Sequence, residues 1–214
     1  MNYQWYPGHM TKTRRMIAEQ IKQIVDARIP ISSRNPDIDS LAVNKARIIL
    51  LNKSDLADDK ITNQWINYFN ENNIYCLKLN SRNNSGIKQV NGLIMTACAD
   101  KIERNKQRGI LNRPIRAMVV GIPNVGKSTF INSYAGKASA KTGVTKGKQW
   151  IKLNKNVELL DTPGILWPKF DNQEVGKRLA MIGSMNDEIL NVEELAIDTI
   201  KYIYSEYSGN VIER

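Results

Sequence analysis

The stretch Gly121-Ile122-Pro123-Asn124-Val125-Gly126-Lys127-Ser128 decides the fold of this 214-residue chain. It follows the pattern GxxxxGK[ST], in which backbone N–H groups wrap the phosphates of a nucleotide. An apolar run at 115–120 precedes it and a helical pattern at 128–134 follows it, so a strand is predicted to deliver the loop to the start of a helix. In that context Lys127 is expected to reach the β- and γ-phosphates, and the Ser128 hydroxyl is expected to ligate Mg²⁺.

A second motif indicates which base is bound. Asn52-Lys53-Ser54-Asp55 follows the apolar strand pattern at 46–51. The Asp55 carboxylate can accept hydrogen bonds from both N1–H and the 2-amino group of guanine, whereas adenine offers neither donor. Asn52 can bond the base edge from the other side, and the Lys53 stem can pack on the purine face. Beside a phosphate loop, this motif predicts a guanine nucleotide.

A third motif, Asp161-Thr162-Pro163-Gly164, follows the strand pattern at 157–160. Asp161 is expected near Mg²⁺, through a water molecule, and the Gly164 N–H is available to a γ-phosphate. Thr145, between the phosphate loop and this motif, is the candidate for the switch threonine that closes over the metal.

Asn80-Ser81-Arg82, at the end of the strand pattern 74–79, is expected to add a backbone contact to the guanine oxygen. The residues expected to bind the nucleotide are Asn52, Lys53, Asp55, Asn80, Ser81, Asn124, Val125, Gly126, Lys127, Ser128, Thr129 and Gly164. The residues expected to hold Mg²⁺ are Ser128, Thr145 and Asp161.

The alternation of strand and helix patterns predicts a doubly wound α/β fold with a mainly parallel sheet. Helical patterns cover 61–69, 172–183 and 192–207. Between them, apolar positions from 87 to 102 predict a single helix that ends near Gly109. The patterns at 148–153 and 157–160 predict a hairpin. A boundary is expected near Trp167-Pro168-Lys169, giving a nucleotide domain at 1–168 and a helical region at 169–214.

The order of the motifs is unusual, because the guanine-reading motif precedes the phosphate loop. Together with three more segments, this order resembles the circularly permuted GTPases, and among them the ribosome biogenesis GTPase A family. The segments are Tyr6-Pro7-Gly8-His9-Met10, Asp26-Ala27-Arg28-Ile29-Pro30 and Ser32-Ser33-Arg34-Asn35-Pro36. The resemblance covers nearly the whole chain, from Trp5 to about Tyr207. It implies a P-loop GTPase fold in circularly permuted order, with a C-terminal helical region that is longer in the family than here.

The resemblance also implies a function. A member of this family would hydrolyse GTP, with stimulation by the ribosomal subunit, late in assembly of the bacterial large (50S) subunit. Its partners would be the precursor of that subunit and its ribosomal RNA. The alternative is a nucleotide-gated RNA- or ribosome-binding protein with weak or vestigial hydrolysis. A P-loop kinase acting on a small molecule is a more distant alternative, because Asn52-Lys53-Ser54-Asp55 would then be a coincidence.

Two segments depart from the family pattern. Only Ile24 and Val25 precede Asp26 as an apolar run, which predicts a short first strand. The switch stretch at 141–145 lacks the Pro-Gly that the resemblance implies before Val-Thr.

Two further roles follow from the resemblance and from elimination. By the resemblance, the side-chain oxygen of Asn124 helps hold K⁺ beside the phosphates, the alternative being an asparagine that only shapes the turn. The position after the third motif is Ile165, which cannot orient a water molecule. His9, the one histidine of the chain, is the candidate for that role, the alternative being an exposed or RNA-contacting histidine. The expected catalytic residues are therefore His9, Lys127, Thr145 and Gly164.

The composition fits these expectations. A formal net charge of +10 favours contact with a polyanion such as RNA, although a solvated basic surface is the plain alternative. The basic residues cluster at Lys12, Arg14, Arg15, Lys101, Arg104, Lys106, Arg108, Arg113 and Arg116. No apolar run is long enough for a membrane span. Cys76 and Cys98 are expected in the core, in a reducing compartment. A cytoplasmic monomer is expected.

Overall fold

The computed structural model describes residues 20–36, 38–39, 45–111, 113–136, 150–152, 156–161, 172–185 and 190–207. The chain falls into two compact units, Met1–Pro168 and Lys169–Arg214. The assignment of separate functional domains to 1–168 and 169–214 stays a prediction.

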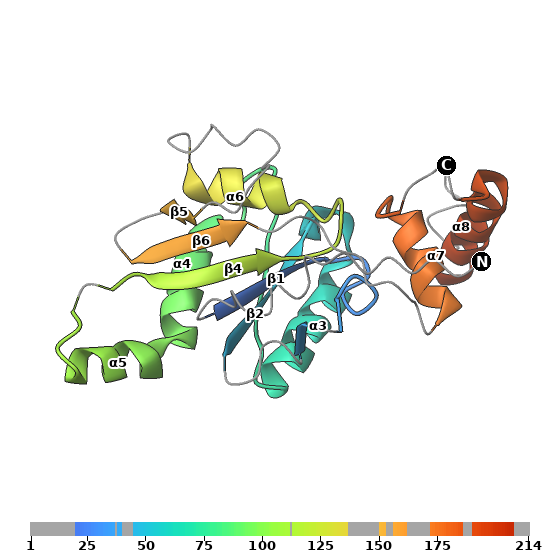
Figure 1. Ribbon diagram of the computed structural model, residues 1–214. Helices are drawn as coiled ribbons and strands as arrows, with labels where there is room; N and C mark the ends of the chain where they lie inside the picture. Colours follow the sequence, from blue (N-terminus) through green and yellow to red (C-terminus); the bar gives the residue numbers. More distant parts are fainter. Residues whose placement is uncertain are drawn as a thin grey trace. The chain divides into compact units, whose positions relative to one another are not determined.

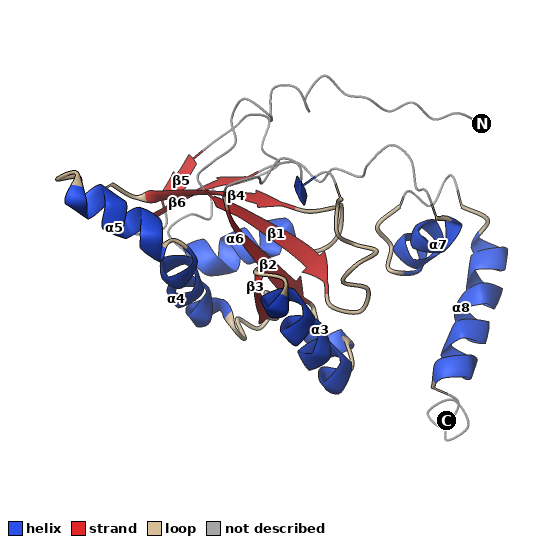
Figure 2. Cartoon of the chain, turned by 90° about the horizontal axis from the view of Figure 1, so that it is seen from below, coloured by secondary structure: helices blue, strands red, loops and turns tan. Residues whose placement is uncertain are grey.

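Within the described residues of the first unit, six strands form one sheet in the order β3-β2-β1-β4-β6-β5. The strands are β1 (Gln20–Asp26), β2 (Ala46–Asn52), β3 (Tyr75–Lys78), β4 (Ile115–Val120), β5 (Trp150–Lys152) and β6 (Val157–Asp161). All neighbouring strands are parallel except β5 and β6, which are antiparallel. Most of this order can be followed in Figure 1, and Figure 2 adds β3 beside β2. The predicted mainly parallel α/β sheet is confirmed.

The first strand differs from the prediction. β1 has seven residues and pairs with β2 along its whole length. It also pairs with β4, so it lies inside the sheet. Lys22 and Gln23 are buried, with 0% and 3% of their surface exposed. Backbone hydrogen bonds to β2 and β4 extend the strand over polar residues as well, so the strand is longer than its apolar run. The prediction of a short first strand was wrong.

Four α-helices and a short 3₁₀ helix are described in this unit. They are η1 (Ser54–Leu56), α3 (Asp59–Glu71), α4 (Ile87–Ala97), α5 (Ala99–Gln107) and α6 (Lys127–Ala135). α3 covers one face of the sheet, where Phe69 packs in a cluster with Val25 and Ile49. Successive side chains of a strand point to opposite faces, so Lys22 points to the other face. There α4 and α6 pack together, and Lys22 lies over the ring of Tyr134 in α6.

The single helix predicted from 87 to 102 is two helices that meet at Cys98. The backbone of Cys98 has φ −109° and ψ 12°, which ends α4, although its N–H still bonds the oxygen of Ile94. α4 buries Ile87, Val90 and Ile94, whereas α5 buries none of its residues. The prediction of one continuous helix was wrong. The helical spacing of apolar residues continues past Cys98, but the helix breaks there, and tertiary packing rather than local sequence sets the break.

The second unit contains α7 (Gln173–Met181) and α8 (Val192–Glu206). Both begin at an asparagine cap, where the side chains of Asn172 and Asn191 accept hydrogen bonds from backbone N–H groups of the first turn. The two helices are joined by an ion pair of 3.0 Å between Lys177 Nζ and Asp198 Oδ2. Across the part of the chain that the structure describes, no helix is both long enough and apolar enough to cross a membrane.

Candidate nucleotide-binding site

The phosphate loop leaves β4 and turns directly into α6. Gly126 caps the helix with φ 91°, and Asn124 also adopts the left-handed region, with φ 59°. Lys127 is the first residue of α6, and its Nζ donates to the backbone oxygens of Gly121 and Ile122 at 3.0 and 2.9 Å. A helix start with a buried ammonium beside it favours an anion, because the helix N-terminus carries partial positive charge. The predicted strand–loop–helix arrangement is therefore present.

Two glycines allow this loop to lie against the neighbouring strands. A Cβ on Gly126 would lie 2.4 Å from Asn52 Nδ2, and a Cβ on Gly121 would lie 2.5 Å from the backbone oxygen of Ile24. Real Cβ atoms do not approach other atoms so closely. The glycine spacing of the motif is thus set by contact with β1 and with the end of β2.

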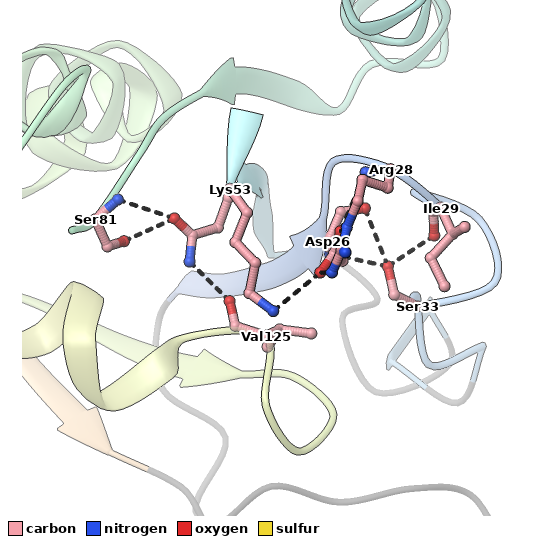
Figure 3. Close-up of polar contacts among 8 residues, drawn as sticks. Asp26, Arg28, Ile29, Ser33, Lys53, Ser81 and Val125 are labelled. Atoms are coloured by element: carbon pink, nitrogen blue, oxygen red, sulfur yellow. Dashed lines mark hydrogen bonds and ion pairs between the residues drawn. The ribbon is translucent and has the colours of Figure 1, made fainter. Parts of the chain in front are cut away.

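The side chain of Asn52 joins three loops. Its Nδ2 donates to the backbone oxygen of Val125 at 2.7 Å. Its Oδ1 accepts from the backbone N–H and from the hydroxyl of Ser81, at 3.0 and 2.9 Å. Figure 3 shows Ser81 and Val125 approaching from opposite sides. The predicted bond from Asn52 to the base edge stays a prediction, and it would use the second hydrogen of Nδ2.

Lys53 and Asp55 occupy the turn after Asn52. Lys53 has a left-handed backbone, with φ 59°, and Asp55 lies exposed in η1. The Nζ of Lys53 lies 3.2 Å from Oδ2 of Asp26, the last residue of β1. Arg28 donates to the same carboxylate through Nε and NH2, each at 2.8 Å. Asp55 is exposed in the turn beyond the carboxyl end of β2, and its contact with guanine stays a prediction.

The carboxylate of Asp26 stays ionised although its side chain is fully buried. Burial alone would raise the pKa of Asp26, but the hydrogen bond and charge of Arg28, helped by the charge of Lys53, outweigh burial and lower it. The hydrogen bond to Asp26 also raises the pKa of Arg28, with a smaller contribution from the charge of Asp55.

Asn80 and Ser81 form the turn after β3. Asn80 Oδ1 accepts from the backbone N–H groups of Arg82 and Asn83, at 2.8 and 3.3 Å. The backbone N–H of Asn80 itself donates to Ser85. Each backbone N–H from 80 to 82 thus already donates within the protein. The predicted contact with the guanine oxygen stays a prediction, and it requires one of these bonds to be shared.

The predicted metal residues are described only in part. Ser128 and Thr129 are exposed in the first turn of α6. Asp161 ends β6 opposite Val119 of β4, which brings the end of β6 beside the phosphate loop. His9, Thr145, Gly164 and the switch stretch at 141–145 lie outside the described residues.

Asp26 was missed as a site residue. The sequence contained a signal for it, because an acidic residue that ends a buried strand and is followed two residues later by arginine can form a local ion pair. Its second partner, Lys53, becomes visible only from the pairing of β1 with β2, which places Asp26 opposite Asn52.

A phosphate-loop motif after β4 and the Asn52-Lys53-Ser54-Asp55 motif after β2, on a sheet of this order, define the P-loop GTPase fold in circularly permuted order. A family model described as "50S ribosome-binding GTPase" matches residues 116–210. "Ribosome biogenesis GTPase A" of Priestia megaterium is 47% identical, over 100% of this chain and 78% of the relative. The protein of the same name from Bacillus cereus is 46% identical, over 100% of this chain and 76% of the relative.

Solved structures agree. The crystal structure of GNP-bound YlqF from T. maritima superposes with a TM-score of 0.68 at 26% identity, covering 94% of this chain and 75% of that one. The chain belongs to the ribosome biogenesis GTPase A family.

Proposed function

We propose that this protein binds guanine nucleotide and hydrolyses GTP during assembly of the large ribosomal subunit. Membership of the ribosome biogenesis GTPase A family and the match to the 50S ribosome-binding GTPase model support the proposal. The observation that carries it is the Asn52 side chain, which ties the guanine-reading turn to the phosphate loop through Val125. The base and the phosphates are expected to contact different loops, and this hydrogen bond holds those two loops together.

In this proposal the nucleotide is GTP or GDP. The residues assigned to it are Asn52, Lys53, Asp55, Asn80, Ser81, Asn124, Val125, Gly126, Lys127, Ser128, Thr129 and Gly164. Lys127 fits the role of a phosphate ligand, because its ammonium lies within the loop and donates to the backbone oxygens of Gly121 and Ile122. Exchange of these carbonyls for phosphate oxygens would replace neutral acceptors with charged ones, which form stronger hydrogen bonds.

Mg²⁺ would be held by Ser128, Thr145 and Asp161, of which Ser128 lies exposed in the first turn of α6. The ion would neutralise charge that develops on the phosphates. K⁺ would be held in part by Asn124, whose left-handed backbone turns at the rim of the loop. Among the proposed catalytic residues, Lys127 and the Gly164 N–H would stabilise the transferred phosphoryl group, Thr145 would close over the metal, and His9 would orient the water.

The proposed partner is the precursor of the large ribosomal subunit, contacted through its RNA by a monomer in the cytoplasm. Arg104, Lys106 and Arg108 support RNA contact, because they lie exposed on or directly after α5, a helix that buries none of its residues. Cations on such a surface bind phosphates through counterion release, so binding should weaken steeply with salt.

The test is GTP turnover with and without purified large subunits, together with sedimentation of the protein with subunits in GDP or a non-hydrolysable GTP analogue. Stimulated turnover and nucleotide-dependent co-sedimentation support the proposal. Co-sedimentation without turnover would instead favour a nucleotide-gated RNA-binding protein, an outcome that the apolar Ile165 makes worth testing. If the protein neither co-sediments with the subunits nor hydrolyses GTP, both candidate functions are contradicted.

A further inference from the structure

The carboxylate of Asp26 bonds two cationic side chains at once, those of Arg28 and Lys53. It ends β1 with its side chain fully buried, and Figure 3 shows it between Arg28 and Lys53. Arg28 binds both carboxylate oxygens, each at 2.8 Å, as a planar guanidinium fork can. Lys53 Nζ approaches Oδ2 at 3.2 Å. Lys53, one of these two side chains, belongs to the turn after β2 that is proposed to bind the base.

The loop after β1 does not depend on this carboxylate alone. The backbone N–H of Asp26 donates to Ser33 Oγ at 2.9 Å, and that hydroxyl donates to the oxygen of Ile29 at 2.8 Å. The N–H of Ile29 returns to the backbone oxygen of Asp26 at 3.1 Å. The carboxylate adds one backbone bond, from the N–H of Arg28 at 3.1 Å. The main chain and Ser33 thus hold the loop, which leaves the carboxylate to orient cations.

Lys53 needs such an anchor. Its backbone is left-handed, a conformation that residues with a Cβ rarely adopt, and its side chain is 27% exposed. A lysine side chain has four rotatable bonds and would sample many rotamers in water. An ion pair at its tip restricts those rotamers and fixes the course of the methylene stem. Fixing a group before the ligand arrives increases affinity, because less freedom is lost on binding.

We propose that Asp26 is a positioning residue for nucleotide binding: oriented by Arg28, its carboxylate anchors the ammonium of Lys53 and presents the lysine stem to the purine face. This inference rests on the proposed guanine-nucleotide site and deepens it. The ammonium of Lys53 bonds Asp26 and not the nucleotide, so it affects nucleotide binding only by fixing the position of the lysine stem. The partner assigned to the stem is the face of the purine ring, whereas its edge is left to Asp55.

A double-mutant cycle tests this assignment. GDP affinity is measured by calorimetry for the parent, Asp26→Asn, Lys53→Met and the double variant; methionine keeps the stem and removes the ammonium. Each single variant should bind GDP about tenfold more weakly, and the double variant should bind like either single one, because both changes remove one interaction. A double variant weakened about a hundredfold would overturn the proposal, because the two groups would then act independently.

A second nucleotide separates this role from base reading. Asp26→Asn should weaken GDP and inosine diphosphate by the same factor, because the stem contacts the ring face and both purines present one. A changed ratio would overturn the proposal. Asp39→Asn is the matched control: Asp39 pairs with Arg34 and Arg47 on the same unit, and its loss should leave GDP affinity unchanged.

Should Asp26→Asn fail to fold, Lys53→Met still decides the matter. Carboxyl ¹³C NMR of the parent and this variant should show that the pKa of Asp26 rises when the ammonium is lost. An unchanged titration would show that the pair does not form in solution and would overturn the proposal. If the parent itself fails to bind GDP, the proposed function fails. If the parent binds GDP and all four proteins bind equally, only the present inference fails.

Discussion

Replacing Lys22 with methionine should stabilise the protein. Lys22 lies in the middle of β1 with 0% of its surface exposed, and its Nζ has no hydrogen-bond partner among the described residues. The ring of Tyr134 lies 5.5 Å from that ammonium. Burial lowers the pKa of Lys22 from 10.5 to about 7, although Cys98 acts in the opposite direction.

The size of the effect follows from that pKa. Each tenfold change in proton affinity corresponds to about 1.4 kcal/mol, so the shift from 10.5 to about 7 costs the folded state roughly 5 kcal/mol while the lysine is fully protonated. At pH 7 the folded group is half deprotonated, and the cost is roughly 4 kcal/mol. A desolvated cation–π contact is worth about 2 kcal/mol and reduces that cost only in part. Methionine retains the stem and ends in an apolar group, so Lys22→Met should raise the free energy of unfolding by about 2 to 4 kcal/mol at pH 7.

The gain should also depend on pH. Between about pH 7 and pH 10.5 the unfolded chain holds a proton on Lys22 that the folded protein has released. Stability therefore rises with pH in this window, because the unfolded state binds more protons. The advantage of Lys22→Met should be largest at or below pH 7 and should nearly vanish near pH 10.

Urea denaturation of parent and variant at pH 7, 8 and 9, followed by circular dichroism, measures this. Lys88→Met is the matched control, because Lys88 is exposed on α4 and its replacement should change stability little at any pH. A destabilised Lys22→Met protein at pH 7, or a gain that is the same at all three pH values, would refute the reasoning.

Three other substitutions and one change of salt test the site. Asp55→Asn should weaken GTP binding by about 2–4 kcal/mol and strengthen binding of xanthosine triphosphate, measured by competition, because a donor replaces an acceptor. Gly126→Ala should weaken GDP binding at least about tenfold in calorimetry, because its Cβ would lie 2.4 Å from Asn52 Nδ2. GTP turnover should be faster in K⁺ than in Na⁺ if Asn124 helps hold the ion. His9→Ala should lower subunit-stimulated turnover at least about tenfold, ~1.4 kcal/mol of barrier, with nucleotide affinity nearly unchanged.

Each expectation has a contrary result. Equal GTP affinity in Asp55→Asn and parent would remove Asp55 from the base site. Unchanged GDP affinity in Gly126→Ala would show that the loop tolerates displacement of Asn52. Identical turnover in the two salts would leave Asn124 as a residue that shapes the turn, and parental turnover of His9→Ala on the subunit would exclude His9.

Local motifs were predictable from the sequence because the backbone itself forms them. The loop from Gly121 to Lys127 needs glycine where its backbone is left-handed or lies close to a strand, and these glycines can be recognised in the sequence. The apolar run of β4 is equally visible, because parallel strands in the middle of a sheet are buried on both faces. The mainly parallel fold followed from these patterns.

Features that depend on pairing between distant segments were not predictable. β1 contains Lys22 and Gln23, so its length is set by neighbouring strands rather than by its own composition. The ion pair between Asp26 and Lys53 requires the register of two strands, which no local pattern specifies. The break at Cys98 has the same origin, since packing of α4 ends before its apolar spacing does.

The placement of β1 has a consequence for the growing chain on the ribosome. β1, β2 and β3 are synthesised before β4, so β1 is an open edge of the nascent sheet until residues 115–120 have been made. An open edge recruits strands from other chains, and a lysine within it opposes such pairing. Lys22 is costly in the finished sheet, whereas on the open edge of the unfinished sheet its charge is expected to oppose pairing with other chains.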